Sequence, residues 1–192
     1  MAARKRRDRV YRVFEVSCGW AAAARGREGL CAFGLPEISR EIAEKNIRAL
    51  ARKDFEPSKS ALRDVVSLAR RYFHGWRTNF GDVRLDLSAG TAFQRKVWSI
   101  VREIPYGEVR TYRWIALELG RPEAARAIGG ALAANPVPLI VPCHRIVNAN
   151  GTLGGFSAGG GVTLKRRILE LERVPMAGEG TRTRVLAGRA SR

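Results

Sequence analysis

The stretch Asn135-Pro136-Val137-Pro138-Leu139-Ile140-Val141-Pro142-Cys143-His144-Arg145 places a thiol beside an imidazole, after an apolar segment rich in proline. Proline fixes its own φ and favours extended geometry in the residue before it, so we expect a rigid, strand-like arm that presents Cys143. A cysteine attacks as thiolate, and at an ordinary pKa near 8.5 only about 3% is ionised at pH 7. Neighbours on an extended chain point to opposite sides, so His144 assists Cys143 only if the backbone turns or a water bridges them. Alone, the stretch also fits an inert buried cysteine beside a surface histidine.

The residues after this stretch predict a turn, a loop and a helix. Asn148-Ala149-Asn150-Gly151 is a turn signal, and the glycine-rich segment 154–161 predicts a loop that lets backbone approach a ligand closely. We expect an amphipathic helix over 162–172, with Leu164, Ile168 and Leu171 on its buried face.

The first half of the chain predicts an α+β unit. We expect strands over 10–16, 18–24, 29–35 and 80–87, and helices over 37–53 and 61–74. The first helix would use Ile38, Ile42 and Leu50 as its apolar positions, and Ser58 would cap the second. His74 is expected on the surface at a helix end.

The second half is expected to be mainly helical, after a boundary at 88–90. Thr91 caps a predicted helix that runs to about Glu103, Thr111 caps a short one to Leu119, and a third runs from Pro122 to Ala134. Two short helices across a glycine turn are typical of a helix-turn-helix, although many helical pairs share this pattern.

Charge and cysteine usage restrict the partners and the compartment. The 192 residues carry a net charge of +17, which indicates a polyanionic partner or serves solubility. Three cysteines and two histidines fit neither a paired disulfide framework nor a full metal set. We expect Cys18 and Cys31 to be packed thiols, a reducing cytoplasmic setting (nucleoid-associated if the source is bacterial), no membrane span and a monomer.

Several ordered motifs resemble one family, the 6-O-alkylguanine-DNA alkyltransferases, also called methylated-DNA-protein-cysteine methyltransferases. They are Gly90-Thr91-Ala92-Phe93-Gln94, Ile104-Pro105-Tyr106-Gly107-Glu108, Ala124-Ala125-Arg126-Ala127-Ile128-Gly129-Gly130, Asn135-Pro136 and Val141-Pro142-Cys143-His144-Arg145-Ile146-Val147. The resemblance implies a small ribonuclease-H-like structural domain over 10–88 and a helical DNA-binding and alkyltransferase domain over 89–174. We expect disordered basic tails over 1–9 and 175–192.

The resemblance also implies a role for each motif residue. Cys143 would accept the alkyl group, His144 would be its base through a water, and Glu172 would orient the imidazole; Asn135 and Tyr112 complete the catalytic set. Arg126 would replace a flipped nucleotide in the stack, beside Ala124, Ala125, Ala127 and Gly129 on a helix that enters the minor groove. Ser157, Phe156, Val141 and Pro142 would line the base pocket, with Phe156 standing where a tyrosine is common. From the residues alone, Arg126 could pair with Glu123, Tyr112 could be a packing residue and Glu172 could be solvated.

The resulting hypothesis is DNA repair by direct reversal without metal or cofactor. The partner would be double-stranded DNA holding 6-O-alkylguanine, mainly methylguanine, with 4-O-methylthymine as a further candidate. The nucleotide must leave the stack before a thiolate can reach the alkyl carbon, and the thioether product limits each molecule to one reaction. The alternatives are a helix-turn-helix protein that binds alkylated DNA or regulates without transfer, and a cysteine hydrolase.

Overall fold

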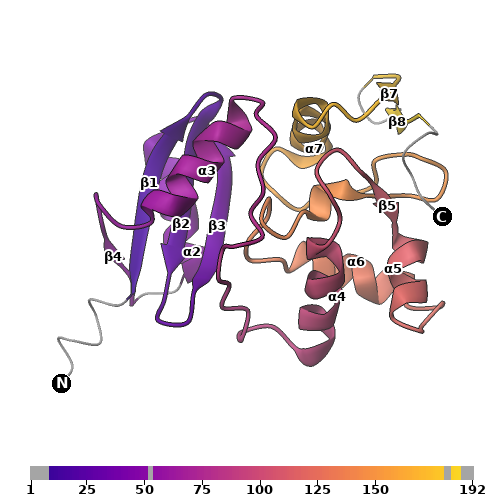
Figure 1. Ribbon diagram of the computed structural model, residues 1–192, viewed down its shortest axis with the longest axis horizontal. Coiled ribbons are helices and arrows are strands. Elements are labelled where there is room, and N and C mark those ends of the chain that lie inside the picture. Colours follow the sequence, from indigo (N-terminus) through magenta and orange to yellow (C-terminus); the bar gives the residue numbers. More distant parts are fainter. Residues whose placement is uncertain (1–8, 52–53, 180–182, 187–192) are drawn as a thin grey trace. The chain divides into compact units, whose positions relative to one another are not determined.

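The computed structural model describes residues 9–51, 54–179 and 183–186, and it divides into two compact units. Unit 1 holds the residues up to Ala89 together with Pro136–Ile140, and unit 2 holds Gly90–Asn135 and the residues from Val141 onward. The mixed α+β architecture predicted from the sequence is confirmed, with helices and small sheets along the chain (Figure 1).

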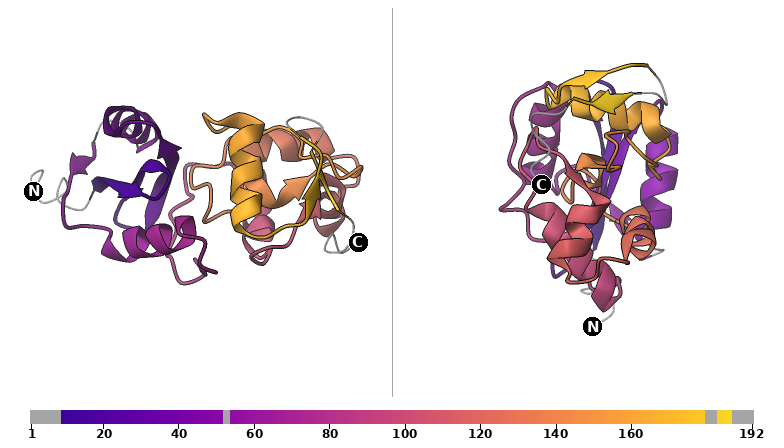
Figure 2. Two further views of the ribbon diagram at one scale, coloured as in Figure 1. Left: turned by 90° about the horizontal axis from the view of Figure 1, so that it is seen from above. Right: turned by 90° about the vertical axis from the view of Figure 1, so that its right-hand side faces the viewer.

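Unit 1 is built on a four-stranded sheet of order β3-β2-β1-β4. Its strands are β1 (Val10–Val16), β2 (Gly19–Arg25), β3 (Leu30–Glu37) and β4 (Glu56–Pro57). β1, β2 and β3 pair antiparallel in chain order, whereas β4 pairs parallel with β1. α2 (Arg40–Ala51) and α3 (Arg63–Phe73) lie on opposite faces of this sheet (Figure 2).

The centre of the sheet carries small side chains, which suits the packing of helices on both of its faces. Four consecutive alanines of β2, Ala21 to Ala24, are fully buried, although alanine favours helices as an isolated residue. Side chains that alternate between the faces of a strand must all be small where packed layers approach closely on both sides. Tertiary packing therefore decides the conformation of this run.

Two predictions for unit 1 were wrong. α2 buries Ala43, Ile47 and Ala51, whereas the expected positions Ile38, Ile42 and Leu50 are exposed. Ile38 precedes the helix, and the small alanines allow the face around Ile47 to lie against the sheet. The predicted strand over 80–87 is reduced to one bridge between Leu30 and Leu85, because a turn closed by the Val83 N–H on the Phe80 carbonyl interrupts it.

α3 begins later than predicted but buries the predicted face. Ser58 accepts a hydrogen bond from the Ala61 amide, so it caps a turn before the helix, and Leu62 in the left-handed region (φ 60°) leads into Arg63. Val65, Val66, Ala69 and Phe73 are buried, and Gly75 ends the helix with φ 81°. His74 is exposed at that end, as predicted.

Unit 2 contains four helices and two small two-stranded sheets in its described part. The helices are α4 (Ala92–Arg102), α5 (Tyr112–Glu118), α6 (Ala125–Ala133) and α7 (Gly161–Leu171); η1 (Cys143–Arg145) is a single 3₁₀ turn. β5 (Arg110–Thr111) pairs parallel with β6 (Ile146–Val147), and β7 (Met176–Ala177) pairs antiparallel with β8 (Arg184–Val185). The capping residues predicted for α4 and α5 are confirmed, since Thr91 and Gln94 form a reciprocal capping box and Thr111 accepts from the Trp114 amide.

The expected disordered tail from residue 175 is corrected for its described part. β7 and β8 pair there, and Val185 packs into a core cluster with Val109, Leu169 and Val174. An apolar residue that buries its side chain supplies the free energy that holds such a short hairpin in place. Residues 180–182 and 187–192 of this tail, and residues 1–8 of the other, lie outside the described residues.

Candidate active site

The backbone turns at Cys143, which corrects the expected strand-like arm. Cys143 starts the 3₁₀ turn η1, and its amide donates to the Val141 carbonyl over 2.8 Å. Upstream, Leu139 is buried with φ 77°, a left-handed conformation that glycine, which lacks a Cβ, would adopt more easily. The three prolines therefore shape a folded turn, and the two side chains after Pro142 are not forced to opposite sides of a strand.

Asn135 connects this turn to the sulfur. Its side-chain amide lies 2.8 Å from the Val141 carbonyl oxygen and 3.3 Å from Cys143 Sγ, and donates to both. Cys143 is 8% exposed. Burial raises the pKa of its thiol, although the Asn135 amide acts in the opposite direction. The resting side chain is therefore a thiol, and a nucleophilic thiolate requires a nearby base.

The two residues after Cys143, His144 and Arg145, form a buried network with Glu172. His144 Nε2 lies 2.9 Å from Glu172 Oε1, and Arg145 Nε and Nη2 lie 2.9 Å and 2.7 Å from the two carboxylate oxygens. The Gly107 amide also donates to Glu172, over 3.1 Å, and Arg145 Nη1 donates to the Ile104 carbonyl over 2.6 Å. A carboxylate with this many donors is fixed in position and in charge.

These contacts set the protonation of the network. Burial alone would raise the pKa of the Glu172 carboxyl, but His144 and Arg145 outweigh it and hold that pKa well below its usual value. Burial lowers the pKa of His144 despite the adjacent carboxylate. A neutral imidazole that donates from Nε2 to Glu172 keeps its lone pair on Nδ1. This nitrogen is buried, and it has no hydrogen-bond partner among the residues that the structure describes.

Lys165 is a buried cation that the sequence interpretation missed. Its Nζ donates to the carbonyls of Ile146 and Leu153, and the side chain is fully buried. Burial lowers its pKa to about 8, and the electrostatic influence of Cys143 opposes this shift. α7 buries Lys165, Ile168 and Leu169, so the prediction is confirmed at Ile168, whereas the predicted Leu164 and Leu171 are only half-buried. The face that holds Lys165 continues to Glu172 at i+7, a pattern that could have revealed both charged residues.

The other residues expected around the cysteine differ in burial. Tyr112, the first residue of α5, has its pKa raised by burial first and by Cys143 second, which identifies an electrostatic neighbour of the sulfur. Val141 and Pro142, the two residues before Cys143, are buried. Phe156 is half-buried, whereas Ser157 is exposed and its hydroxyl donates to the Ala133 carbonyl over 3.3 Å.

α5 and α6 form the predicted pair of short helices across Gly120, which has φ 64°. α6 buries Ile128, Ala131 and Leu132. Its other side presents Ala125, Arg126, Ala127 and Gly130 to solvent, with Ala124 and Gly129 half-exposed. The alternative ion pair between Arg126 and Glu123 does not occur among the described residues.

Three further findings concern thiols, metals and membranes. Neither Cys18 nor Cys31 is in a disulfide; Cys18 is exposed, contrary to the expected packing, and Cys31 is half-buried. Among residues 9–51, 54–179 and 183–186, no three potential metal ligands of the Cys, His, Asp or Glu type come together. Within the same ranges, no helix combines the length and the apolar composition that crossing a bilayer requires.

Comparison with known proteins places this site in a family. Residues 92–174 match the family model described as "6-O-methylguanine DNA methyltransferase, DNA binding domain". A methylated-DNA–protein-cysteine methyltransferase of Haemophilus influenzae is 47% identical over 58% of this chain, a match that spans 60% of that relative's length. The crystal structure of Mycobacterium tuberculosis OGT in complex with DNA superposes with a TM-score of 0.71 at 40% identity, covering 85% of this chain and 92% of that one.

An archaeal relative extends the match over a complete chain. The methylated-DNA–protein-cysteine methyltransferase of Methanosarcina acetivorans is 36% identical over 84% of this chain and 97% of its own length. The chain therefore belongs to the methylated-DNA–protein-cysteine methyltransferase family.

Proposed function

We propose that the protein repairs DNA by direct reversal, moving the alkyl group of 6-O-alkylguanine irreversibly to Cys143. The observation that carries the proposal is a buried cysteine followed directly by His144, whose neutral imidazole has its Nε2 held by the ionised Glu172 carboxylate. Cys143, His144 and Glu172 can therefore act as nucleophile, base and orienting group, respectively. Membership of the family supplies the substrate class.

The reaction removes one proton from the thiol and adds one proton to the leaving guanine. His144 takes the Cys143 proton on Nδ1 through a water, and the thiolate attacks the alkyl carbon opposite the guanine oxygen. The sulfur–carbon bond forms as the carbon–oxygen bond breaks, and guanine leaves with one more proton than it brought. Tyr112 supplies this proton; burial keeps its pKa raised, so its hydroxyl stays protonated and acts as a donor.

Lys165 and Asn135 act on the charge of the sulfur. A protonated Lys165 favours the thiolate electrostatically from a site that water does not screen, and the Asn135 amide donates directly to Sγ. The two groups offset part of the cost of ionising a thiol that is 8% exposed. The product is a thioether, which water does not hydrolyse under mild conditions, so each molecule reacts once.

DNA binding is assigned to α5 and α6. Four small residues at the start of α6 and along it, the exposed Ala125 and Ala127 and the half-exposed Ala124 and Gly129, let this helix lie close to the floor of the minor groove. None of them has a polar side chain for base-specific readout. Arg126 is exposed and takes the place of the extruded nucleotide. Ser157, Phe156, Val141 and Pro142 line the pocket for the flipped base.

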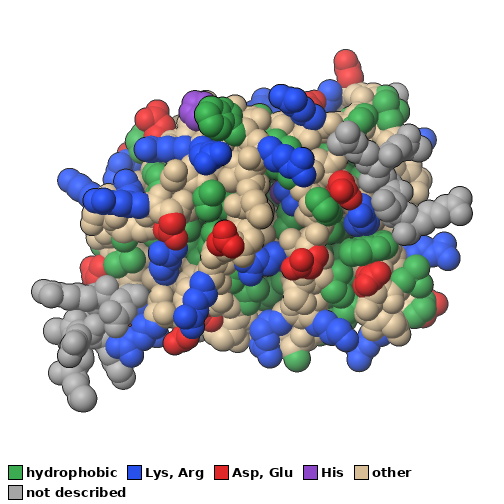
Figure 3. Space-filling model, in the orientation of Figure 1, with side chains coloured by type: hydrophobic (Ala, Val, Ile, Leu, Met, Phe, Trp, Pro, Cys, Tyr) green, Lys and Arg blue, Asp and Glu red, His purple; other side chains and the backbone are tan. Residues whose placement is uncertain are grey.

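Charge supplies attraction that does not depend on base sequence. In Figure 3, Lys and Arg side chains are spread over the face in view, as a net charge of +17 suggests. Neutralisation of phosphates releases counterions, which favours binding at any position along a duplex. A repair protein that must search all sequences benefits from this indifference.

Unit 1 is proposed to be a ribonuclease-H-like domain with a mainly structural role. Its strand order β3-β2-β1-β4, with the fourth strand parallel to the first, supports this description. We also propose that the protein acts as a monomer in the cytoplasm, where reducing conditions keep Cys143 as a thiol.

Intact-mass measurement after mixing with methylguanine duplex tests the proposal. Every active molecule should gain about one methylene equivalent, on the peptide that holds Cys143, and Cys143→Ser should gain none while still binding DNA. Cys18→Ser/Cys31→Ser is the matched control and should react normally. Repeated turnover, or labelling at Cys18 or Cys31, would overturn the assignment and favour a binding protein without transfer.

A further inference from the structure

Unit 1 contains a groove of about 820 Å³ that takes no part in the proposed repair chemistry. It runs along the exposed side of α3 and is bordered by β1 and by the segment before the helix. Five of its side chains are cationic: Arg12, Lys59, Arg63, Arg70 and Arg71. Among the residues that the structure describes, no acidic side chain lines it. The groove therefore concentrates positive charge within a single concave surface.

These cations are available to an external anion. None of the five forms an ion pair with a carboxylate in the described part of the chain. Arg12 and Arg70 donate to the carbonyls of Ala61 and Glu15, which position the two guanidinium groups without cancelling their charge. Lys59 and Arg63 are exposed.

The helix repeats this charge along one line. Arg63 and Arg70 are seven residues apart, two turns of α3, so their attachment points lie about 10 Å apart on the same side of the helix. Ser67 lies between them, with a hydroxyl that can donate to an anion. A row of donors at this spacing suits an extended ligand with repeated negative charges better than a single small anion.

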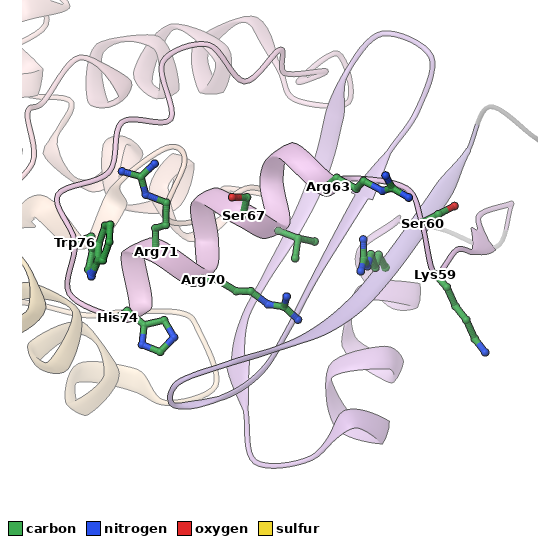
Figure 4. A pocket seen from close by; sticks show the side chains of 10 residues that line it. Lys59, Ser60, Arg63, Ser67, Arg70, Arg71, His74 and Trp76 are labelled. Carbon is green, nitrogen blue, oxygen red and sulfur yellow. The ribbon is translucent and has the colours of Figure 1, made fainter.

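The C-terminal end of the groove adds an aromatic surface. Trp76 is 61% exposed, unusually high for a tryptophan, and the Arg71 guanidinium lies 5.4 Å from its ring centroid. Figure 4 shows Arg71 and Trp76 together at this end of α3, Lys59 and Arg63 at the other, and Arg70 between them. An indole held beside a cation offers a flat face on which an unpaired base can stack.

We propose that this α3 groove binds single-stranded DNA, with phosphates along Lys59, Arg63 and Arg70 and a base against Trp76. Cationic tracks that end in aromatic platforms are the recognition chemistry of unpaired strands, because every base has a face that can stack. The cations would also attract an acidic peptide or an anionic membrane, and the stacking surface of the indole beside them favours a strand with unpaired bases. The inference needs only a DNA-binding protein, and is independent of the transfer reaction.

Fluorescence anisotropy with a labelled twelve-residue oligothymidylate tests the proposal on the full chain. Arg63→Glu/Arg70→Glu should weaken binding at least tenfold at about 100 mM salt, and should reduce the salt slope by about 1.4, since each phosphate contact on a single strand contributes about 0.7. The matched control is Lys45→Glu/Arg48→Glu, an equal charge change on exposed positions of α2, which should weaken binding less than threefold. Equal weakening by both pairs would reduce the effect to net charge and overturn the site.

Trp76 separates single strands from other polyanions. Trp76→Ala should weaken binding of the oligothymidylate about tenfold, Trp76→Phe should restore most of it, and neither should change binding to a blunt duplex. The milder Arg63→Gln/Arg70→Gln repeats the charge test if the reversal disturbs folding. Unchanged strand affinity in Trp76→Ala, or loss of binding to phosphatidylserine vesicles or polyglutamate alone, would overturn the proposal. Transfer from a free alkylguanine base should be normal in every variant, which separates this test from the repair reaction.

Discussion

His144 Nε2 and Glu172 Oε1 lie 2.9 Å apart, and both side chains are almost completely removed from solvent. The carboxylate comes from the C-terminal end of α7, and the imidazole comes from the 3₁₀ turn that holds Cys143. Arg145 keeps the carboxylate charged, so the imidazole is held in one tautomer with Nδ1 available. In the proposed mechanism, the reactivity of Cys143 therefore depends on a residue 29 positions away in the chain.

Glu172→Gln should slow alkyl transfer on the order of a hundredfold or more, because a neutral amide no longer fixes the imidazole tautomer. It should also lower the free energy of unfolding by about 3 kcal/mol, since Arg145 is left with a buried, unpaired charge. Single-turnover rates and urea unfolding measure the two effects. Glu170→Gln, on the exposed side of the same helix, is the control and should change stability by no more than about 0.5 kcal/mol. Equal effects of the two variants would contradict a special role for the buried carboxylate.

Glu172→Gln should change how the free energy of unfolding depends on pH in the acid range. The folded-state pKa of Glu172 is depressed, so its stabilising contribution is complete above the unfolded value near 4.3 and is lost as pH falls below it. His144 is neutral in the fold with a depressed pKa, so stability already declines as pH falls below about 6.5. In urea titrations between pH 3 and 7, only the wild type should show the decline in stability below about pH 4.3. A parallel decline in the variant would show that other carboxyls control acid unfolding.

Lys165→Met should slow transfer, because removal of a nearby buried cation makes the Cys143 thiolate harder to form. The lysine pKa is about 8 in the folded protein and about 10.4 unfolded, so the unfolded chain binds more protons between these values. The free energy of unfolding of the wild type, relative to the variant, should therefore rise from pH 8 to pH 10. Denaturant titrations at several pH values check this sign, and the exposed Lys96→Met should show no such rise.

Gly129 should distinguish folding from DNA docking on α6. A Cβ added at this residue meets no atom within 4 Å, and the residue lies inside the helix. Gly129→Ala should stabilise the protein by about 0.5–1 kcal/mol through helix propensity and bind DNA nearly normally. Gly129→Leu should fold equally well but bind duplex DNA several-fold more weakly, because the larger side chain keeps the helix away from the groove. Thermal unfolding and anisotropy measure the two properties; normal duplex binding by Gly129→Leu would place this face outside the interface.

Arg126→Ala should separate base extrusion from chemistry. If Arg126 stabilises only the extruded state, repair within a duplex should slow roughly a hundredfold, equivalent to about 3 kcal/mol, while reaction with a free alkylguanine base stays nearly unchanged. Arg113→Ala, an exposed arginine on α5, is the comparison for lost phosphate contact. Equal slowing of duplex and free-base reactions by Arg126→Ala would mean that this arginine shapes the pocket.

Local signals in the sequence predicted much of the fold. The first three strands of unit 1, the cap at Thr91 and the end of α3 at Gly75 depend on residues close in sequence, and all of these were confirmed. The face of α2 and the loss of the strand over 80–87 depend on what packs against them, which local patterns do not contain. Ile42 is exposed because small alanines beside it fit closer to the sheet.

At the candidate site, too, local sequence signals predicted some residues, whereas contacts between distant residues escaped them. Cys143 and His144 stand out from their motif, whereas the contact between His144 and Glu172 came only from the family resemblance. Lys165 and Arg145 were missed because a hydrophobic pattern treats a charged residue as a sign of solvent, and here both charges are satisfied inside the protein. Buried ionic networks of this kind become visible only with their partners in place.

The excursion of Pro136–Ile140 into unit 1 limits how the chain can be divided. Asn135 and Val141, which the Asn135 amide joins directly, belong to unit 2, but the five residues between them belong to unit 1, where the Phe33 amide donates to the Pro136 carbonyl over 2.9 Å. A gene fragment that begins at Gly90 would therefore encode the reactive cysteine without the hydrogen-bond donor that holds the loop leading to it. The two units are interleaved in the order of the chain, so no single cut yields both intact.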